Sequence, residues 1–381
     1  MKYNFDKSID RRLTRSYKWD MKEDEYSFSI ADMDFLVADE ISNAIKERAE
    51  QATYGYTYVP KEYFQAYIRW WRDRYNTTLK EEWFCYSASV VASIDVILKR
   101  VTIPNDKVAI FSPNYNVFYN CINNNKCVLN EIPLDYIDNK YSIDYEKLEK
   151  ALKESKVFIL CNPHNPIGHG YSEFELKNIV ELCKKYDVCL ISDEIHSDLD
   201  FNIARYTPIL KVTDYKKAIM LISPSKTFNV AGLHSSVAVI PDPKLRELIQ
   251  NGLYQDDVGE PNYFSIEPVI AAYTKCDEYV NELNDYIKEN RRILSEFFVK
   301  NGLKYKIVSE NFTYLLWVDI SAYSSDSEGF SNRLFEKYHC KVMSGKSYHE
   351  YHSSFIRINI ATQLKNIKKL CDALKNISED K

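Results

Sequence analysis

The chain has 381 residues and a formal net charge of -5, a length that suits two domains or one large α/β unit. Acidic and basic residues are interspersed, so neither a nucleic-acid surface nor a patch for an anionic membrane is expected. No run approaches the ~20 apolar residues of a membrane helix, and the opening stretch MKYNFDKSID lacks the apolar region of a secretory signal. Nine cysteines without a CxxC pair are typical of reduced thiols. We therefore expect a cytoplasmic protein that binds neither nucleic acid nor membrane.

Five short apolar runs in the middle of the chain are typical of strands buried on both faces of a parallel sheet. They are KVAIFSP (107–113), KVFILCNP (156–163), VCLISDE (188–194), AIMLISPS (218–225) and SVAVIPD (236–242). Helical patterns lie between them, and the segment 172–187 begins with a serine N-cap signal and a glutamate three positions later. This alternation predicts a doubly wound α/β domain.

The alternation of apolar runs and helical patterns ends near residue 285. A long helical segment, 277–302, leads to the strand-like runs TYLLWVDI (313–320) and SFIRINIA (354–361). We expect a large α/β domain over 51–284 and a smaller α+β domain over 285–381, to which an N-terminal segment over 1–50 contributes.

Polar side chains follow the predicted strands, at the edge of the sheet where open α/β folds bind ligands. They are SPNY (112–115), Asn162 with Asn165, Asp193 and Glu194 with His196, and Ser223 and Ser225 with Lys226. No metal-ligand spacing, GxSxG or phosphate-binding glycine motif is present. A lysine, an acid, an amide and an aromatic ring at one edge suit pyridoxal phosphate. From its own motif alone, Lys226 could also be a surface lysine at a turn.

Motifs along nearly the whole chain resemble those of fold-type I enzymes dependent on pyridoxal phosphate, the aminotransferase class I/II superfamily, and specifically its MalY/PatB-type cystathionine β-lyase branch. They include RRLTRSYKWD (11–20), IADMDF (30–35), YGYTYVP (54–60), CNPHNPIGHG (161–170), ISDEIHSDLDF (191–201) and SPSKTFNVAGL (223–233). Their order and spacing carry the resemblance. It implies an aspartate aminotransferase-like fold with a large doubly wound domain and a smaller α+β domain.

The resemblance also implies roles for individual residues. Lys226 is similar to the lysine that forms a Schiff base with the cofactor and then acts as the catalytic base. Asp193 matches the acid at the pyridine nitrogen, Asn165 the amide at the ring 3′-oxygen, and Tyr115 the ring that stacks on the cofactor.

Further positions match the parts that hold the phosphate. Ser89, Val90 and Val91 open a helix whose free N–H groups would bind it, and Ser223 and Ser225 would add hydroxyl contacts.

Four more positions bear on the substrate, the partner subunit and the branch. Tyr56 matches a tyrosine that reaches the cofactor of the neighbouring subunit, which implies a homodimer with shared sites. Arg357 corresponds to the arginine that clamps the substrate α-carboxylate. His196, also expected in the cofactor pocket, and His234 stand where many aminotransferases carry tyrosine and arginine, and this favours the lyase branch. Glycines that are usual in the family are missing from two stretches, SGKSYHEYHSSFIRI and YSAS. This difference affects the expected shape of the substrate pocket more than the expected binding of the cofactor.

The resemblance and the residues together predict a lyase that cleaves L-cystathionine or a related cysteine S-conjugate to a thiol, pyruvate and ammonia. An aminotransferase would use the same lysine, acid and arginine and is the alternative. A third possibility is a catalytically idle protein of this fold. The presence of the lysine, the acid, the amide and the arginine together disfavours it. No metal is expected.

Overall fold

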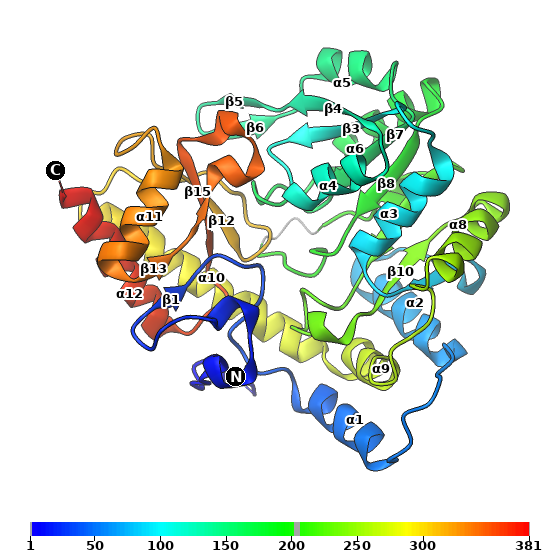
Figure 1. Cartoon of the computed structure of the whole chain (residues 1–381), viewed down its shortest axis with the longest axis horizontal. Helices are drawn as coiled ribbons and strands as arrows, with labels where there is room; N and C mark the ends of the chain where they lie inside the picture. The colour runs from blue at the N-terminus through cyan, green and yellow to red at the C-terminus, as the bar shows by residue number, and fades with distance from the viewer. Residues whose placement is uncertain (1, 202–205, 381) are drawn as a thin grey trace.

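The computed structural model describes residues 2–201 and 206–380, which are built around a seven-stranded central sheet (Figure 1). In spatial order its strands are β2 (Phe84–Ser87), β10 (Ser236–Val239), β9 (Ala218–Ile222), β8 (Cys189–Asp193), β7 (Val157–Cys161), β3 (Lys107–Ser112) and β4 (Val128–Pro133). Strands β9, β8, β7, β3 and β4 run parallel to one another. The first four confirm the parallel strands predicted from apolar runs, whereas β4 was not among the predicted strands.

The expectation of a parallel strand over 236–242 is wrong. Strand β10 lies antiparallel to both β9 and β2. The reason is its connection: the chain returns from β9 to β10 without a crossover helix, and a parallel return would need one. The returning loop, 223–235, carries Lys226 and lies at the carboxyl end of β9.

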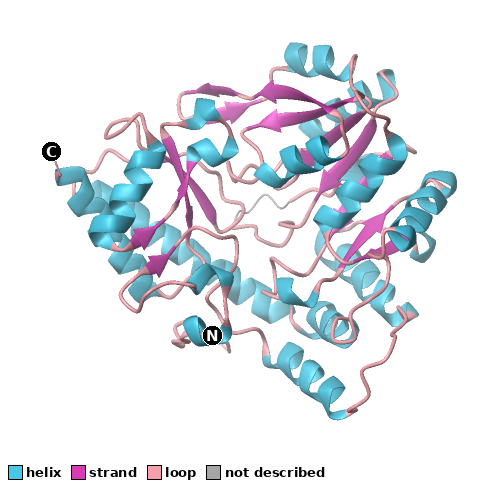
Figure 2. Cartoon of the chain, viewed as in Figure 1, coloured by secondary structure: helices cyan, strands magenta, loops and turns pink. Residues whose placement is uncertain are grey.

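Apolar side chains cover both faces of the sheet. Along β3, Val108 and Ile110 belong to one buried cluster, whereas Ala109 and Phe111 belong to the other, because side chains alternate across a strand. On the Val108 side lie α3 (Val90–Val101), α4 (Asn116–Asn124) and α8 (Pro243–Gln255). On the other side lie α2 (Lys61–Tyr75), α5 (Tyr145–Leu152), α6 (Glu173–Lys185) and α9 (Ile266–Lys275). The result is the helix–sheet–helix arrangement of a doubly wound fold (Figure 2).

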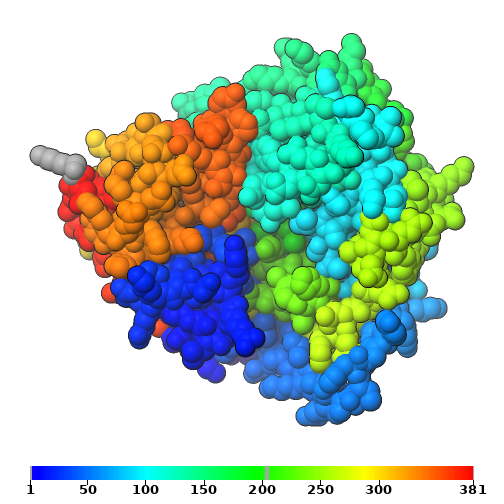
Figure 3. Space-filling model, in the orientation of Figure 1, coloured from blue at the N-terminus to red at the C-terminus, as the bar shows by residue number. Residues whose placement is uncertain are grey.

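A second sheet of four antiparallel strands lies in the C-terminal part of the chain. Its order is β11 (Lys306–Ile307), β12 (Leu315–Asp319), β15 (Phe355–Asn359) and β14 (Met343–Ser344). It is accompanied by α10 (Asp277–Lys300), α11 (Ser327–Tyr338) and α12 (Leu364–Glu379). Strand β1 (Tyr26–Ser27) pairs in parallel with β13 (Cys340–Lys341), so N-terminal residues lie against the C-terminal part (Figure 3).

Three smaller elements complete the fold: α1 (Asp39–Glu50), α7 (Ile209–Val212) and the hairpin of β5 (Asp135–Ile137) and β6 (Lys140–Ser142). The helix predicted at 172–187 is confirmed as α6, with Ser172 and Glu175 forming the capping box. Helix α10 runs through the predicted domain boundary at 284/285, and the proposed domain limits stay predictions. Within the described ranges no helix combines the length and apolar character needed to cross a bilayer.

Candidate active site

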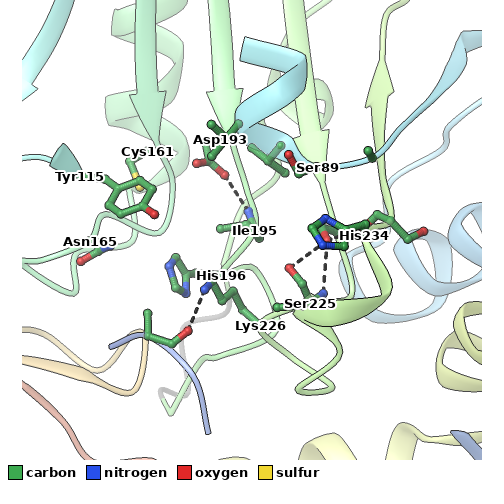
Figure 4. Close-up of a pocket in the computed structure, with 17 residues that line it drawn as sticks. Ser89, Tyr115, Cys161, Asn165, Asp193, Ile195, His196, Ser225, Lys226 and His234 are labelled. Carbon is green, nitrogen blue, oxygen red and sulfur yellow. Dashed lines mark hydrogen bonds between the residues drawn. The ribbon is translucent and has the colours of Figure 1, made fainter. Parts of the chain in front are cut away.

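A pocket opens at the carboxyl ends of the parallel strands, beside the N-terminus of α3 (Figure 4). It is lined by Ala31, Ala88, Ser89, Val90, Val91, Tyr115, Cys161, Asn165, Asp193, Ile195, His196, Ser223, Ser225, Lys226, Ala231, His234 and Ser235. Ten of the twelve residues that the sequence assigned to the site are in this set. The two others, Tyr56 and Arg357, lie outside the lining.

Lys226 enters the pocket from the loop between β9 and β10. Its Nζ donates a hydrogen bond of 2.7 Å to the carbonyl oxygen of Ala31 (Figure 4). Burial lowers the pKa of Lys226 to about 8, although the carboxylates of Asp32 and Asp193 act in the opposite direction. A half-buried lysine of this kind is a usable nucleophile and base near neutral pH, and the alternative of an exposed turn lysine is wrong.

Asp193 is the last residue of β8 and is buried. Its Oδ1 accepts a hydrogen bond of 3.1 Å from the backbone N–H of Ile195. Burial raises the pKa of Asp193 to about 7, while the Ile195 N–H and the charge of Lys226 oppose the rise. A carboxyl group in this setting gains strongly from a cationic partner, and the protonated pyridine nitrogen of pyridoxal phosphate is such a partner.

The neighbouring residue Glu194 points to the opposite side of the strand. Its carboxylate accepts hydrogen bonds from Ser192 Oγ (2.7 Å), the Ile209 N–H (2.9 Å) and the hydroxyl of Tyr206. These partners hold Glu194 inside the large domain, away from the pocket.

One side of the pocket carries an aromatic ring and an amide (Figure 4). Tyr115 precedes α4 as its N-cap residue, and burial raises the pKa of its phenol. Asn165 is buried, and its side-chain oxygen accepts a hydrogen bond of 3.1 Å from Nη1 of Arg357. The arrangement supplies a flat ring and an amide within one cavity, as the proposed roles in cofactor binding require.

The N-terminus of α3 forms the anion-binding side of the pocket. Ser89 caps the helix by accepting a hydrogen bond of 3.0 Å from the Ala92 N–H. Val90 and Val91 occupy the first turn, where backbone N–H groups have no partner within the helix and attract anions. A helix start of this kind is suited to an anion such as a phosphate group.

Ser223 joins the two ends of the loop that carries Lys226. Ser223 Oγ donates a hydrogen bond of 2.7 Å to the carbonyl oxygen of Ser235 and lies 2.9 Å from Ser225 Oγ. The structure therefore gives Ser223 a role in fixing the loop, and Ser225 also lines the cavity.

Arg357 reaches the site from β15 of the second sheet. Its Nη2 donates a hydrogen bond of 2.6 Å to the Ser29 carbonyl oxygen, and its guanidinium carbon lies 5.3 Å from the centre of the Tyr348 ring. Its Nε is buried without a hydrogen-bond partner among the described residues. Arg357 thus adjoins the pocket through Asn165 and retains a free N–H donor for an anionic ligand.

His196 is buried beside Lys226, and its Nδ1 has no hydrogen-bond partner in the described part of the chain. Burial lowers its pKa well below the usual range, and the positive charges of Lys226 and Arg357 add to this effect. The ring is therefore neutral.

Tyr56 is fully exposed on the segment between α1 and α2. It does not contact the pocket of its own chain. Its assignment to a site shared between subunits stays a prediction.

Sequence reasoning missed the contribution of Ala31, which lies in the IADMDF motif but offers only a backbone carbonyl. The sequence also offered no reason to assign three further lining residues to the pocket, because side chains of these types are common in a core. They are Cys161, Ile195 and Ser235. In the part of the chain that the structure describes, no three histidine, cysteine, aspartate or glutamate side chains gather as a metal site would require.

A doubly wound sheet with a buried lysine and acid at its carboxyl edge defines the class of fold-type I enzymes dependent on pyridoxal phosphate. The sequence model of the family described as "Aminotransferase class I and II" matches residues 23–374, and the chain belongs to this family. Cystathionine β-lyase PatB of Bacillus subtilis (strain 168) is 33% identical over 384 residues, which cover 98% of this chain and 98% of PatB.

Two solved structures share the fold over the whole chain. Cystalysin from Treponema denticola, which contains a pyridoxal 5′-phosphate cofactor, superposes with a TM-score of 0.95 at 29% identity and covers 100% of both chains. A C–S lyase from Staphylococcus hominis with bound pyridoxal phosphate has a TM-score of 0.94 at 30% identity, with 100% of this chain and 99% of the other covered.

Proposed function

We propose that this chain is a carbon–sulfur β-lyase that uses pyridoxal 5′-phosphate to cleave L-cystathionine or a related cysteine S-conjugate. The products are a thiol, pyruvate and ammonia, and water is consumed. The observation that carries the proposal is that Lys226, Asp193, Asn165 and Tyr115 line one pocket in a chain similar to PatB over 98% of its length.

The residues present fit the cofactor. Lys226 would attach it, Asp193 would face its ring nitrogen, and Asn165 and Tyr115 would hold the ring. The first turn of α3 would bind its phosphate. When bound, the cofactor supplies an electron sink for the carbanion that forms at the substrate Cα.

Lys226 is the residue suited to move the proton. Because burial lowers its pKa to about 8, a substantial fraction of Nζ is neutral near that pH and can accept the Cα proton. The resulting ammonium can deliver a proton to the departing sulfur, so that one side chain serves both halves of the elimination. His196, which is neutral, adds no positive charge that would disfavour this protonation.

Arg357 is placed to bind the substrate α-carboxylate. Two of its donors hold Asn165 and Ser29, and Nε is available for a further bond. Binding at this point would fix the substrate between the second sheet, which carries Arg357, and the loop between β9 and β10, which carries Lys226.

We also propose that the enzyme works in the cytoplasm as a homodimer. The support for a dimer is Tyr56, which is fully exposed on its own chain and is similar to a tyrosine that completes the partner's site. The absence of a membrane-crossing helix among the described residues agrees with a cytoplasmic location.

An aminotransferase is the second candidate, because the matching family carries that name and the activity uses the same residues. The two differ in their need for an amino-group acceptor. Purified protein with pyridoxal phosphate is incubated with L-cystathionine, with and without a 2-oxo acid, and Lys226→Ala serves as the inactive control. We expect equal amounts of pyruvate and homocysteine without the 2-oxo acid. A keto product that forms only when the acceptor is present would identify an aminotransferase.

A further inference from the structure

Asp198 lies in the turn after β8, five residues beyond Asp193, and is buried with its carboxylate surrounded by donors. Its Oδ1 accepts hydrogen bonds from Trp70 Nε1 (2.8 Å) and the Tyr75 hydroxyl (2.5 Å), both on α2. Its Oδ2 accepts a hydrogen bond of 3.0 Å from Thr227 Oγ1, and Arg74 Nε lies 3.6 Å from Oδ1. The carboxylate therefore connects α2 to the residue that follows Lys226.

This connection matters because Lys226 lies on a loop outside any helix or strand. Backbone hydrogen bonds from Phe228 to Pro224 and from Val230 to Ser225 hold the turn itself, and side-chain contacts join it to the rest of the fold. Ser223 holds the incoming side through its bond to Ser235, and Thr227, which is fully buried, holds the outgoing side through Asp198. Asn229 fixes the next stretch by donating to the carbonyl oxygens of Met33 (3.1 Å) and Phe35 (3.0 Å).

Asp198 itself has little freedom to move. Helix α10 binds its backbone, since Asn284 Nδ2 donates a hydrogen bond of 2.8 Å to the Asp198 carbonyl oxygen. Trp70 contributes twice: its indole N–H binds the carboxylate, and its ring packs edge-on against Phe228 with the ring centres 5.7 Å apart. The anchor is thus built from three separate elements, α2, α10 and the turn after β8.

We propose that Asp198 is a positioning residue, which acts through Thr227 to hold the amino group of Lys226 at the reacting centre. The inference rests on the attachment of the cofactor to Lys226 in the proposed function. Removal of the Thr227 hydroxyl leaves a buried carboxylate oxygen without that donor, and the loop or the carboxylate must shift to compensate. A displacement of this kind changes the orientation of Nζ while Arg357, on another sheet, still binds the substrate.

The test uses the holoenzyme and three variants. Thr227→Val removes the hydroxyl at nearly constant volume, and Thr227→Ser retains it. Thr77→Val is the matched control, because Thr77 is equally buried and its hydroxyl donates to the Tyr75 carbonyl oxygen (3.2 Å) at the end of α2. The readouts are the pH midpoint of the visible absorbance of the bound cofactor, kcat, and KM for L-cystathionine.

We expect Thr227→Val to shift the absorbance midpoint by about half a pH unit or more and to lower kcat about tenfold or more, with KM changed less than about threefold. Thr227→Ser and Thr77→Val should resemble the wild type in both properties. A folded Thr227→Val enzyme with unchanged midpoint and kcat would overturn the inference, as would an equal change in Thr77→Val.

If Thr227→Val does not fold, the same measurements on Asp198→Asn decide the question, with a shifted midpoint expected and an unshifted one contradicting the inference. The absorbance readout needs only a lysine-bound cofactor and no lyase activity. If the wild-type enzyme shows a pH midpoint for the absorbance of its lysine-bound cofactor and yet releases no pyruvate from L-cystathionine, the proposed function is refuted. The shift of the midpoint in Thr227→Val would still test this inference.

Discussion

Arg357 Nη1 lies 3.1 Å from the side-chain oxygen of Asn165, although Arg357 belongs to β15 of the second sheet and Asn165 to the turn that follows β7 of the central sheet. This hydrogen bond joins the residue expected to bind the substrate carboxylate to a residue expected to bind the cofactor ring. The turn that carries Asn165 therefore contacts the second sheet at the point where we expect substrate and cofactor to meet.

The first prediction concerns this arginine. Arg357→Lys should lower kcat/KM by about 30-fold or more, since a lysine cannot hold Asn165 and Ser29 and also give the carboxylate a charge-assisted hydrogen bond worth about 2 kcal/mol. Steady-state kinetics with L-cystathionine measure the loss. Arg246→Lys is the matched control, because the guanidinium of Arg246 donates to two backbone carbonyl oxygens, those of Ile240 and Pro241, and lies away from the pocket. Equal losses in the two variants would contradict the assignment.

The second prediction concerns the acid at the end of β8. Asp193→Asn should still bind the cofactor but lose about 100-fold or more in kcat, because a neutral amide cannot favour a protonated ring nitrogen. Cofactor content is measured by absorbance and kcat by pyruvate release. Glu194→Gln, one residue further on, should alter thermal stability more than kcat, since its partners are Ser192, Tyr206 and Ile209. Near-normal turnover of Asp193→Asn would move the acid role elsewhere.

The third prediction concerns the pH dependence of stability at His169. Burial alone would lower its pKa, but the carboxylates of Glu175 and Glu310, at 3.3 and 2.9 Å, raise the pKa to about 9. Because the folded value exceeds the unfolded value of about 6.5, the stabilisation is complete below pH ~6.5 and is lost as the pH rises through about 9. The Tm of the wild type should exceed that of His169→Gln clearly at pH 6 and only slightly at pH 10. A difference in Tm that does not vary with pH would refute the ion-pair account.

The fourth prediction tests the shared site. A Lys226→Ala chain and a Tyr56→Ala chain, each nearly inactive alone, should regain activity when their subunits exchange. The mixed dimer then contains one site with both residues intact. Exchange is verified with differently tagged chains. If exchange is proven and activity does not return, Tyr56 serves its own chain or no site at all.

Much of the fold and most of the pocket were predictable because the signals are local. Buried parallel strands read as apolar runs, and polar residues that end such strands meet at one edge, as Asp193 and Lys226 do. The reversed direction of β10 was missed, because an apolar run looks the same in either orientation.

Contacts between segments distant in the chain could not be predicted from the sequence. The Ala31 carbonyl that binds Lys226 has no side-chain signature, and the bond between Asp198 and Thr227 depends on how two loops pack. Arg357 was found through the family resemblance, since a single arginine on an apolar strand also suits a simple ion pair. The position of Tyr56 in a site requires a second chain, which one sequence cannot supply.

The most direct test of the central claim is to reduce the cofactor-loaded enzyme with borohydride and map the modified lysine by peptide mass spectrometry. Lys18 is the internal control, because it is also fully buried with a lowered pKa but is paired with Asp34 at 2.9 Å, outside the pocket. We expect the cofactor on Lys226 and an unmodified Lys18. Modification of Lys18, or of any lysine other than Lys226, would contradict it.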